Sequence, residues 1–126
     1  MYKNLTIIAF LGAITILLGA FGAHSLKESL SEEAIKSFET AVRYQMYHVI
    51  LLMILNLSNH LTDKFKRVIT ITILIGVLFF SGSIYCIYLL KIPAKQIWFV
   101  TPLGGLILFF GWGQLCYHFL KKSLKK

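Results

Sequence analysis

Arg43 is the residue of this sequence whose chemistry is most demanding, because it stands beside a long apolar stretch in which a charged side chain needs a partner. Glu39 lies four residues earlier, in the favourable Glu-before-Arg order, and His48 lies five residues later. Two interpretations follow. Either Arg43 pairs with Glu39 and fixes its segment to the neighbouring helices, or Arg43 acts with His48 and His24 to bind an anion such as a lipid phosphate.

A second candidate for anion binding is segment 101–105, which reads Thr-Pro-Leu-Gly-Gly. Thr followed by Pro predicts a helix that starts with Thr101 as its N-cap and the proline at the first helical position. The free backbone amides of such a start attract anions, and Gly104 and Gly105 would allow a close approach. The alternative is that the glycines serve helix packing, since Gly104 and Gly111 are seven residues apart on one face.

These residues border four long apolar segments. Lys, Arg, Asp and Glu are absent from residues 4–23, 44–62, 68–90 and 96–120. Each segment reaches the roughly 20 residues that a helix needs to cross a bilayer. Because lipid offers no partner for free backbone amides, such segments must be helical. The sequence therefore predicts an all-α integral membrane four-helix bundle, a single domain over residues 1–126 with spans at about 4–23, 44–62, 68–90 and 98–120.

The basic residues predict the orientation of the bundle. If both termini are cytoplasmic, eight basic residues lie on that side: Lys3, Lys64, Lys66, Arg67, Lys121, Lys122, Lys125 and Lys126. The opposite side then holds five: Lys27, Lys36, Arg43, Lys91 and Lys95. Since Lys and Arg favour the cytoplasmic side, we predict that both termini are cytoplasmic. This distribution also accounts for the net charge of +8 without nucleic-acid binding.

Under that orientation, the polar residues of the spans gather in the outer half of the membrane. The predicted anion site comprises Arg43, His48, His24, Glu39, Tyr44, Gln45, Tyr47, Ser81, Ser83, Tyr85, Thr101, Gly104 and Gly105. The inner half is mostly Ile, Leu, Val and Phe, interrupted by Asn56, Asn59, His60, Gln114 and His118. We therefore place the candidate site in the outer half.

The histidines do not predict a metal site. His24 and His48 fall near one membrane surface, whereas His60 and His118 fall near the other, and neither pair has Cys or carboxylate ligands at metal spacing. The sequence also shows no nucleophile elbow, zinc-protease helix or phosphate-binding loop. We therefore expect no enzymatic activity, metal or cofactor.

The connections between the spans carry their own signals. Ser29 and Glu32 fit a capping box, and the apolar stripe within residues 30–42 predicts an amphipathic helix between the first and second spans. We expect this segment to lie at the outer membrane surface, or to cap the bundle, and to bend into the second span near Arg43. Residues 63–67 are predicted to form a tight cytoplasmic turn.

Small residues predict where helices pack closely. These are Gly12, Thr15, Gly19 and Gly22 in the first span, Gly76 in the third and Gly111 in the fourth.

An alternative for the first span is a signal peptide, with Lys3 as its positive start and residues 20–22 as a small-x-small cleavage site.

Five blocks carry a family resemblance: Gly-Ala-Phe-Gly-Ala-His at 19–24, Glu-Thr-Ala-Val-Arg-Tyr-Gln-Met-Tyr-His at 39–48, Phe-Ser-Gly-Ser-Ile-Tyr at 80–85, Thr-Pro-Leu-Gly-Gly at 101–105 and Gly-Trp at 111–112. In order and spacing they resemble the family known as domain of unknown function 423, or uncharacterised protein family 0382, which includes YgdD-type proteins. The resemblance covers nearly the whole chain. It implies a four-helix protein of the bacterial cell membrane and no particular reaction.

We predict a non-enzymatic protein of the bacterial inner membrane whose outer polar cluster binds, or helps to move, an anionic lipid headgroup or a small anion. The alternative is a structural or accessory subunit, in which the same residues lock the bundle and the glycine faces dock another membrane protein. The expected partners are membrane lipids and a second copy of the chain or another membrane protein.

Reporter fusions test the predicted topology. A reporter active only in the cytoplasm should be active when fused after Lys126 and inactive when inserted within residues 32–36, because the first lies beyond the basic C-terminal segment and the second in the external connection. An externally active fusion at the C-terminus would reverse every assignment of side above.

Overall fold

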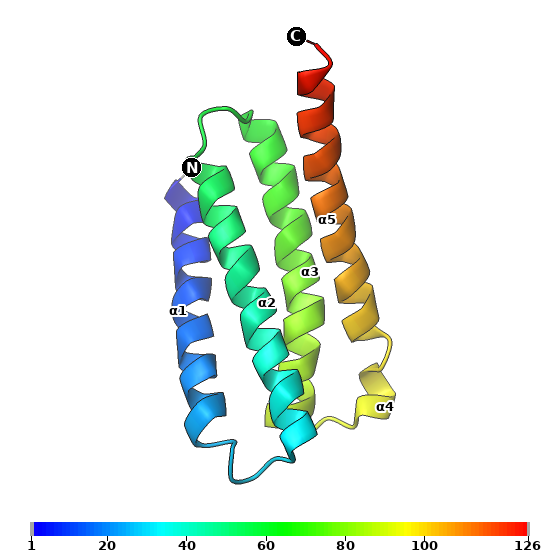
Figure 1. Cartoon of the computed structure of the whole chain (residues 1–126). Helices are drawn as coiled ribbons and strands as arrows, with labels where there is room; N and C mark the ends of the chain where they lie inside the picture. Colours follow the sequence, from blue (N-terminus) through cyan, green and yellow to red (C-terminus); the bar gives the residue numbers. More distant parts are fainter. Residues whose placement is uncertain (1, 126) are drawn as a thin grey trace.

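The computed structural model describes residues 2–125, all of whose regular elements are helices. The helices are α1 (Tyr2–His24), α2 (Glu32–Leu57), α3 (Asp63–Leu89), the short α4 (Ala94–Ile97) and α5 (Val100–Ser123). The four long helices run side by side in alternating directions, which confirms the predicted all-α four-helix bundle (Figure 1). Lys126, one of the basic residues predicted to be cytoplasmic, lies outside the described residues.

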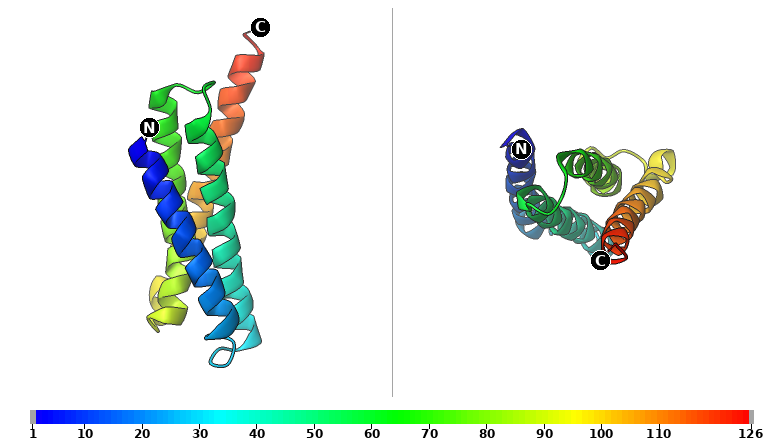
Figure 2. Two further views of the ribbon diagram at one scale, coloured as in Figure 1. Left: turned by 90° about the vertical axis from the view of Figure 1, so that its left-hand side faces the viewer. Right: turned by 90° about the horizontal axis from the view of Figure 1, so that it is seen from above.

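The helices form a chain of neighbours. α1 packs chiefly on α2, α2 on α3, and α3 on α5, so α1 and α5 occupy opposite sides of the molecule (Figure 2). The described ends of the chain and the α2–α3 connection lie at one end, which we call the terminal end (Figure 1). The α1–α2 connection and α4 lie at the other end, which we call the loop end.

Three helical segments are long and apolar enough to cross a membrane: Tyr2–His24, Asp63–Leu89 and Ala94–Ser123. α2 differs because its first half carries charged side chains, from Glu32 to Arg43. Its 26 residues are nevertheless about 39 Å long at 1.5 Å per residue. The predicted second span, 44–62, therefore corresponds to the last part of α2 and to the connection that follows Leu57.

The expected bend near Arg43 is absent, because α2 is a single helix from Glu32 to Leu57. The amphipathic segment is helical as predicted, but it is the first part of the second long helix and not a separate surface segment. The sequence agrees with this continuity, because residues 32–57 contain no Gly or Pro that would kink the helix.

The N-terminal caps also differ from the sequence-based predictions. Ser31, and not Ser29, caps α2 by accepting a hydrogen bond from the Ala34 amide at 3.2 Å. The predicted turn at 63–67 is the first part of α3, because the Thr62 hydroxyl accepts from the Phe65 amide and starts the helix there. The turn itself lies just before, in residues 58–62.

α5 begins two residues earlier than the predicted cap at Thr101 implies. Phe99 precedes its first residue, Val100, and makes no side-chain capping bond. Thr101 is therefore inside the helix, not at its N-cap, and Pro102 follows it within the first turn, where a missing amide hydrogen is tolerated.

Glycines set the distance between α3 and α5. A Cβ on Gly104 would overlap the backbone nitrogen of Phe80, so only glycine allows this approach. Further along, a Cβ on Gly76 would lie 2.6 Å from the Leu108 side chain, and one on Gly111 would lie 2.5 Å from Ile73.

The small face of α1 contacts α2. A Cβ on Gly22 would lie 2.8 Å from the Phe38 ring, and Gly12 and Gly19 face Val49 and Val42. Thr15, on the same face of α1, is 1% exposed and donates its hydroxyl hydrogen to the carbonyl oxygen of Leu11 at 2.7 Å.

Gly104→Ala tests the close contact between α3 and α5. The added methyl group meets backbone that cannot rotate away, so we expect a loss of about 1–3 kcal/mol of stability, measured by thermal unfolding in detergent. Gly113→Ala is the matched control on the same helix, since no atom lies within 4 Å of its added Cβ. The control should be neutral or stabilising by up to about 1 kcal/mol. Equal stability of the two variants would contradict this account of the interface.

Candidate functional site

Gln45 occupies the centre of the predicted site and bonds to two neighbouring helices. Its side chain is 2% exposed, because α2 turns this position towards α1 and α3. The Tyr85 hydroxyl of α3 donates to Gln45 Oε1 at 2.7 Å, and Gln45 Nε2 donates to the Leu11 carbonyl oxygen of α1 at 3.4 Å. Both ends of the amide are therefore used to join helices.

The serines of α3 also bond to other helices. Ser81 Oγ donates to the Ala41 carbonyl oxygen of α2 at 2.7 Å. Ser83 Oγ lies 2.5 Å from Thr101 Oγ1 of α5 and 3.0 Å from the Phe80 carbonyl oxygen of its own helix. The predicted residues Ser81, Ser83 and Thr101 thus contribute to two different helix contacts.

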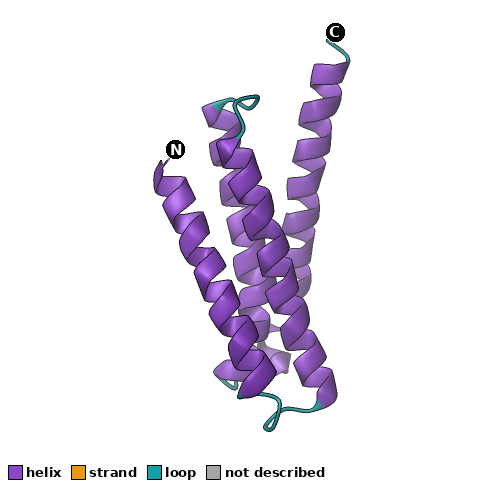
Figure 3. Cartoon of the chain, turned by 60° about the vertical axis from the view of Figure 1, so that its left-hand side comes forward, coloured by secondary structure: helices purple, strands orange, loops and turns teal. Residues whose placement is uncertain are grey.

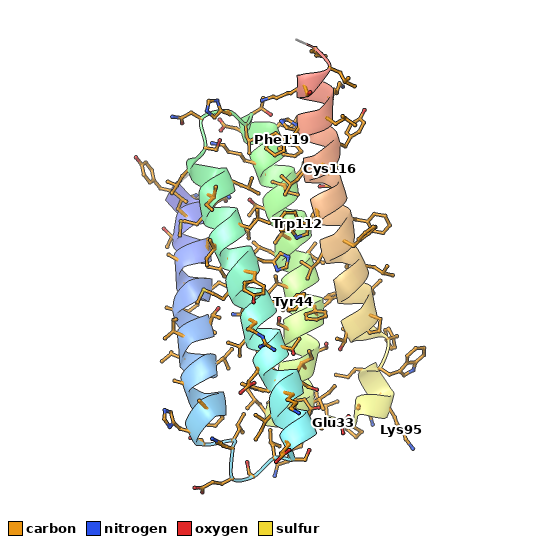
Figure 4. The ribbon with its side chains drawn as sticks, in the orientation of Figure 1. Glu33, Tyr44, Lys95, Trp112, Cys116 and Phe119 are labelled. Carbon is orange, nitrogen blue, oxygen red and sulfur yellow. The ribbon has the colours of Figure 1, made fainter. Side chains whose placement is uncertain are left out.

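His48 has no ring nitrogen left for a ligand. The Trp112 indole N–H of α5 donates to His48 Nε2 at 3.3 Å, and since an indole nitrogen can only donate, Nε2 must accept. His48 Nδ1 lies 2.6 Å from the Tyr44 carbonyl oxygen, which can only accept, so Nδ1 carries the hydrogen. These two bonds describe a neutral imidazole. Tyr44 and Trp112 lie on the same side of the molecule (Figure 4).

Arg43 lies apart from His48. It is exposed, and its guanidinium Nη2 donates to Thr40 Oγ1 of the preceding turn at 3.4 Å. Arg43 and Glu39 line a cavity of about 210 Å³ between α1 and α2, whose α1 wall includes Gly19 and Gly22.

The remaining predicted residues do not complete a common pocket. His24, Tyr44 and Tyr47 are exposed. Gly104 is buried against the backbone of α3, and Gly105 would place a Cβ 3.8 Å from the Phe80 ring. The structure thus distributes the predicted anion site over the α1–α2, α2–α3, α2–α5 and α3–α5 contacts.

A second polar cluster, at the terminal end, was missed by the sequence analysis. Asn4, Asn56, Asp63, Lys66, Arg67 and Thr70 line a crevice of about 400 Å³ together with Ile7, Ile71 and Leu74. The cluster was hidden because residues 63–67 were assigned to a turn. The pair Thr62 and Asp63, a capping residue and an acid at the first helical position, is the signal that would have started α3 there and placed these side chains on a helix face.

Comparison with known proteins identifies the family. The family model described as "Protein of unknown function (DUF423)" matches residues 18–105. The chain belongs to this family. The predicted resemblance is thereby confirmed, and the matched residues contain four of the five blocks from which it was inferred.

The relatives in the DUF423 family are membrane proteins by name. A UPF0382 membrane protein of Haemophilus influenzae is 39% identical over 97% of this chain and 98% of its own length. The UPF0382 inner membrane protein YgdD of Escherichia coli is 33% identical over 85% of this chain and 81% of its own. YwdK of Bacillus subtilis is 33% identical over 81% and 86%, respectively. No solved structure matches the chain. Together with its three long apolar helical segments, these relatives make this DUF423 member a membrane protein.

Tyr85→Phe tests the bond between α2 and α3. Removing the hydroxyl leaves Gln45 Oε1 without its partner, so we expect a loss of about 0.5–1.5 kcal/mol in unfolding experiments in detergent. Tyr88→Phe, on the same helix, removes a hydroxyl that bonds to none of the described residues and should change stability by less. An unchanged unfolding temperature for Tyr85→Phe would show that the bond contributes nothing measurable.

Proposed function

We propose that this DUF423 protein is a non-enzymatic structural or accessory subunit of the bacterial inner membrane, in which the polar residues between the middle of the bundle and its loop end lock the helices together. The observation that carries the proposal is the use of Gln45: both ends of its amide bond to other helices. His48 and Ser81 likewise spend their hydrogen-bonding atoms within the bundle. Polar groups used in this way stabilise a bundle in lipid and are not available to a substrate.

The orientation in this proposal places the terminal end in the cytoplasm. Support comes from the common location of both described chain ends with the α2–α3 connection, which groups Lys3, Lys64, Lys66, Arg67, Lys121, Lys122 and Lys125. Asp63 is the one acidic residue of the sequence in this region, and the four glutamates lie in residues 28–39, towards the loop end. Such a bias of Lys and Arg favours the cytoplasmic side.

A protein partner, or a second copy of the chain, would contact the outward faces of α1 or α5 in this proposal. The glycines that were predicted to dock another protein already face neighbouring helices of the chain: Gly12, Gly19 and Gly22 face α2, Gly76 faces α5, and Gly104 and Gly111 face α3. The outward face of α5 is rich in exposed aromatic side chains, including Phe109, Phe110 and Tyr117.

A second candidate function keeps the loop-end half as a binding site for an anionic headgroup or small anion. The observation that favours it is the exposure of Arg43 beside the cavity lined by Gly19 and Gly22. In this version His48 does not contact the anion, and Arg43 is the cationic group.

Two neighbouring substitutions on α2 distinguish these functions. Under the locking function, Gln45→Ala should lower stability by about 1–3 kcal/mol, because it leaves the Tyr85 hydroxyl without its partner and removes the bond from α2 to the Leu11 carbonyl, which keeps only its bonds within α1. Arg43→Ala should change stability by less than about 0.5 kcal/mol, because the guanidinium is exposed. Thermal unfolding in detergent and native mass spectrometry of co-purified lipid measure both effects. Loss of bound anionic lipid in Arg43→Ala, with the fold intact, would replace the locking function by the second candidate.

An amine-reactive crosslinker applied to native membranes, before the protein is extracted, tests whether the chain has a protein partner. We expect an adduct heavier than the 14.4 kDa chain, formed through the exposed lysines of the terminal end. Recovery of monomer alone, under conditions that crosslink a known membrane oligomer, would contradict an accessory role.

A further inference from the structure

The crevice at the terminal end opens between α1 and α3. α1 is held chiefly by α2 and not by α3, and it leans away from the other helices towards its N-terminus (Figure 3). The space of about 400 Å³ is lined by Asn4 and Ile7 of α1, by Asn56 of α2 and by the first three turns of α3. It therefore faces the side of the molecule where α1 and α3 are not packed together.

Asn56 forms the closed back of this crevice. It is 1% exposed, and its Nδ2 donates to Thr70 Oγ1 and to the Leu52 carbonyl oxygen, both at 2.9 Å. Its Oδ1 accepts from Asn4 Nδ2 at 3.3 Å. Three bonds thus commit the Asn56 amide to holding α1, α2 and α3 together, and both of its N–H donors are used.

Lys66 supplies a buried positive charge in front of Asn56. The side chain is 8% exposed, and its Nζ donates to the Asn56 carbonyl oxygen at 3.2 Å. An ammonium group has three N–H donors, so two remain after this bond, and a charge taken out of water needs a negative partner. The bond that the structure describes runs to a neutral carbonyl, not to a carboxylate.

Arg67 and Asp63 complete the charge of the crevice. Lys66 and Arg67 contribute two positive charges and Asp63 one negative charge, which leaves a net charge of +1 among the lining residues. Arg67 is exposed, and its position beside Lys66 suits a guanidinium that binds phosphate oxygens from the water side.

The polar crevice continues into an apolar groove along the same two helices. The groove measures about 320 Å³ and shares Ile7 and Leu74 with the crevice. Its other walls are Phe10, Leu11 and Ile14 of α1 and Val77, Leu78 and Gly82 of α3, with Gln45 of α2 behind. A cationic opening that leads into a hydrocarbon-lined groove matches a molecule with an anionic head and an apolar chain.

We propose that this crevice and groove bind one anionic phospholipid, with its phosphate between Lys66 and Arg67 and one acyl chain between α1 and α3. The phosphate oxygens accept hydrogen bonds from the free N–H groups of Lys66, and the negative charge of the phosphate compensates the buried positive charge of Lys66. A headgroup with net negative charge suits the net positive lining better than a zwitterionic headgroup. Free phosphate would fill the crevice and leave the groove empty, so the groove identifies the ligand as a lipid. Nothing in this proposal depends on the locking function.

Native mass spectrometry of the full chain in detergent tests the proposal with two lipids that share dioleoyl chains, phosphatidylglycerol and phosphatidylcholine. We expect one phosphatidylglycerol to be retained in preference to phosphatidylcholine. Arg67→Gln should weaken phosphatidylglycerol binding about fivefold, and Lys66→Gln with Arg67→Gln should weaken it further. Arg67 is exposed, so the single variant retains the packing of α3 and keeps the test valid even where the double variant unfolds.

The control for charge is Lys3→Gln with Lys64→Gln, which removes two exposed charges at the same end from residues that do not line the crevice. The groove is tested by Leu78→Trp, which fills it with an indole ring. Its control is Ile75→Trp, which places the same ring on α3 outside the groove. Arg67→Gln and Leu78→Trp should each lose lipid, whereas the Lys3/Lys64 and Ile75 variants should retain it.

Three results would overturn the proposal. The first is equal retention of the two lipids by the unmodified protein. The second is equal loss of phosphatidylglycerol in the Lys3/Lys64 variant and in the Arg67 variant, which would indicate a general surface charge. The third is displacement of the lipid by millimolar inorganic phosphate together with full binding by Leu78→Trp, which would indicate a phosphate site without a groove.

Discussion

The absence of water around the helices is the constraint on which the rest of this structure depends. A polar side chain that faces away from the membrane surface is costly unless it finds a partner within the protein. Gln45 shows the outcome most clearly, because its amide reaches both a carbonyl of α1 and a hydroxyl of α3. His48 and Ser81 follow the same rule with α5 and α2. A soluble protein could expose such polar side chains to solvent, whereas here they form hydrogen bonds between helices.

Close packing of small residues supplies the other part of the assembly. Lipid tails are as apolar as the helix surfaces, so apolar burial alone does not hold two membrane helices together. Gly104 allows α5 to reach the backbone of α3, and Gly22 allows α1 to reach the Phe38 ring of α2. The contact between α1 and α3 has no such close approach, and the space between these helices is where the crevice and groove lie.

The two ends of the bundle consequently differ in chemistry. From the middle of the bundle towards the loop end, Gln45, His48 and Ser81 use their polar atoms in hydrogen bonds to neighbouring helices, and Arg43 is exposed. At the terminal end, Asn56 joins three helices and leaves a buried ammonium group in an open crevice. A polar cluster that is internally satisfied favours stability, whereas a buried charge with unused donors favours a ligand.

The amino-acid sequence by itself determined the membrane environment, the helical class and the family, because long charge-free segments and ordered sequence blocks need no knowledge of distant contacts. The sequence also agrees with an unbroken α2, because no Gly or Pro occurs within residues 32–57. Helix starts were less certain from sequence, since Ser29 and Ser31 are both good caps and only the observed bond to Ala34 chooses between them.

Only the tertiary structure decided which polar residues meet. Depth in the membrane placed Arg43 and His48 at similar levels, but position around the helix turned one outward and the other towards Trp112. The start of α3 at Asp63 likewise brought Lys66 and Arg67 from an expected turn onto a helix face beside Asn56. Depth follows from position along one chain, whereas contacts depend on the rotation and tilt of separate helices, and these are set by packing at the glycines.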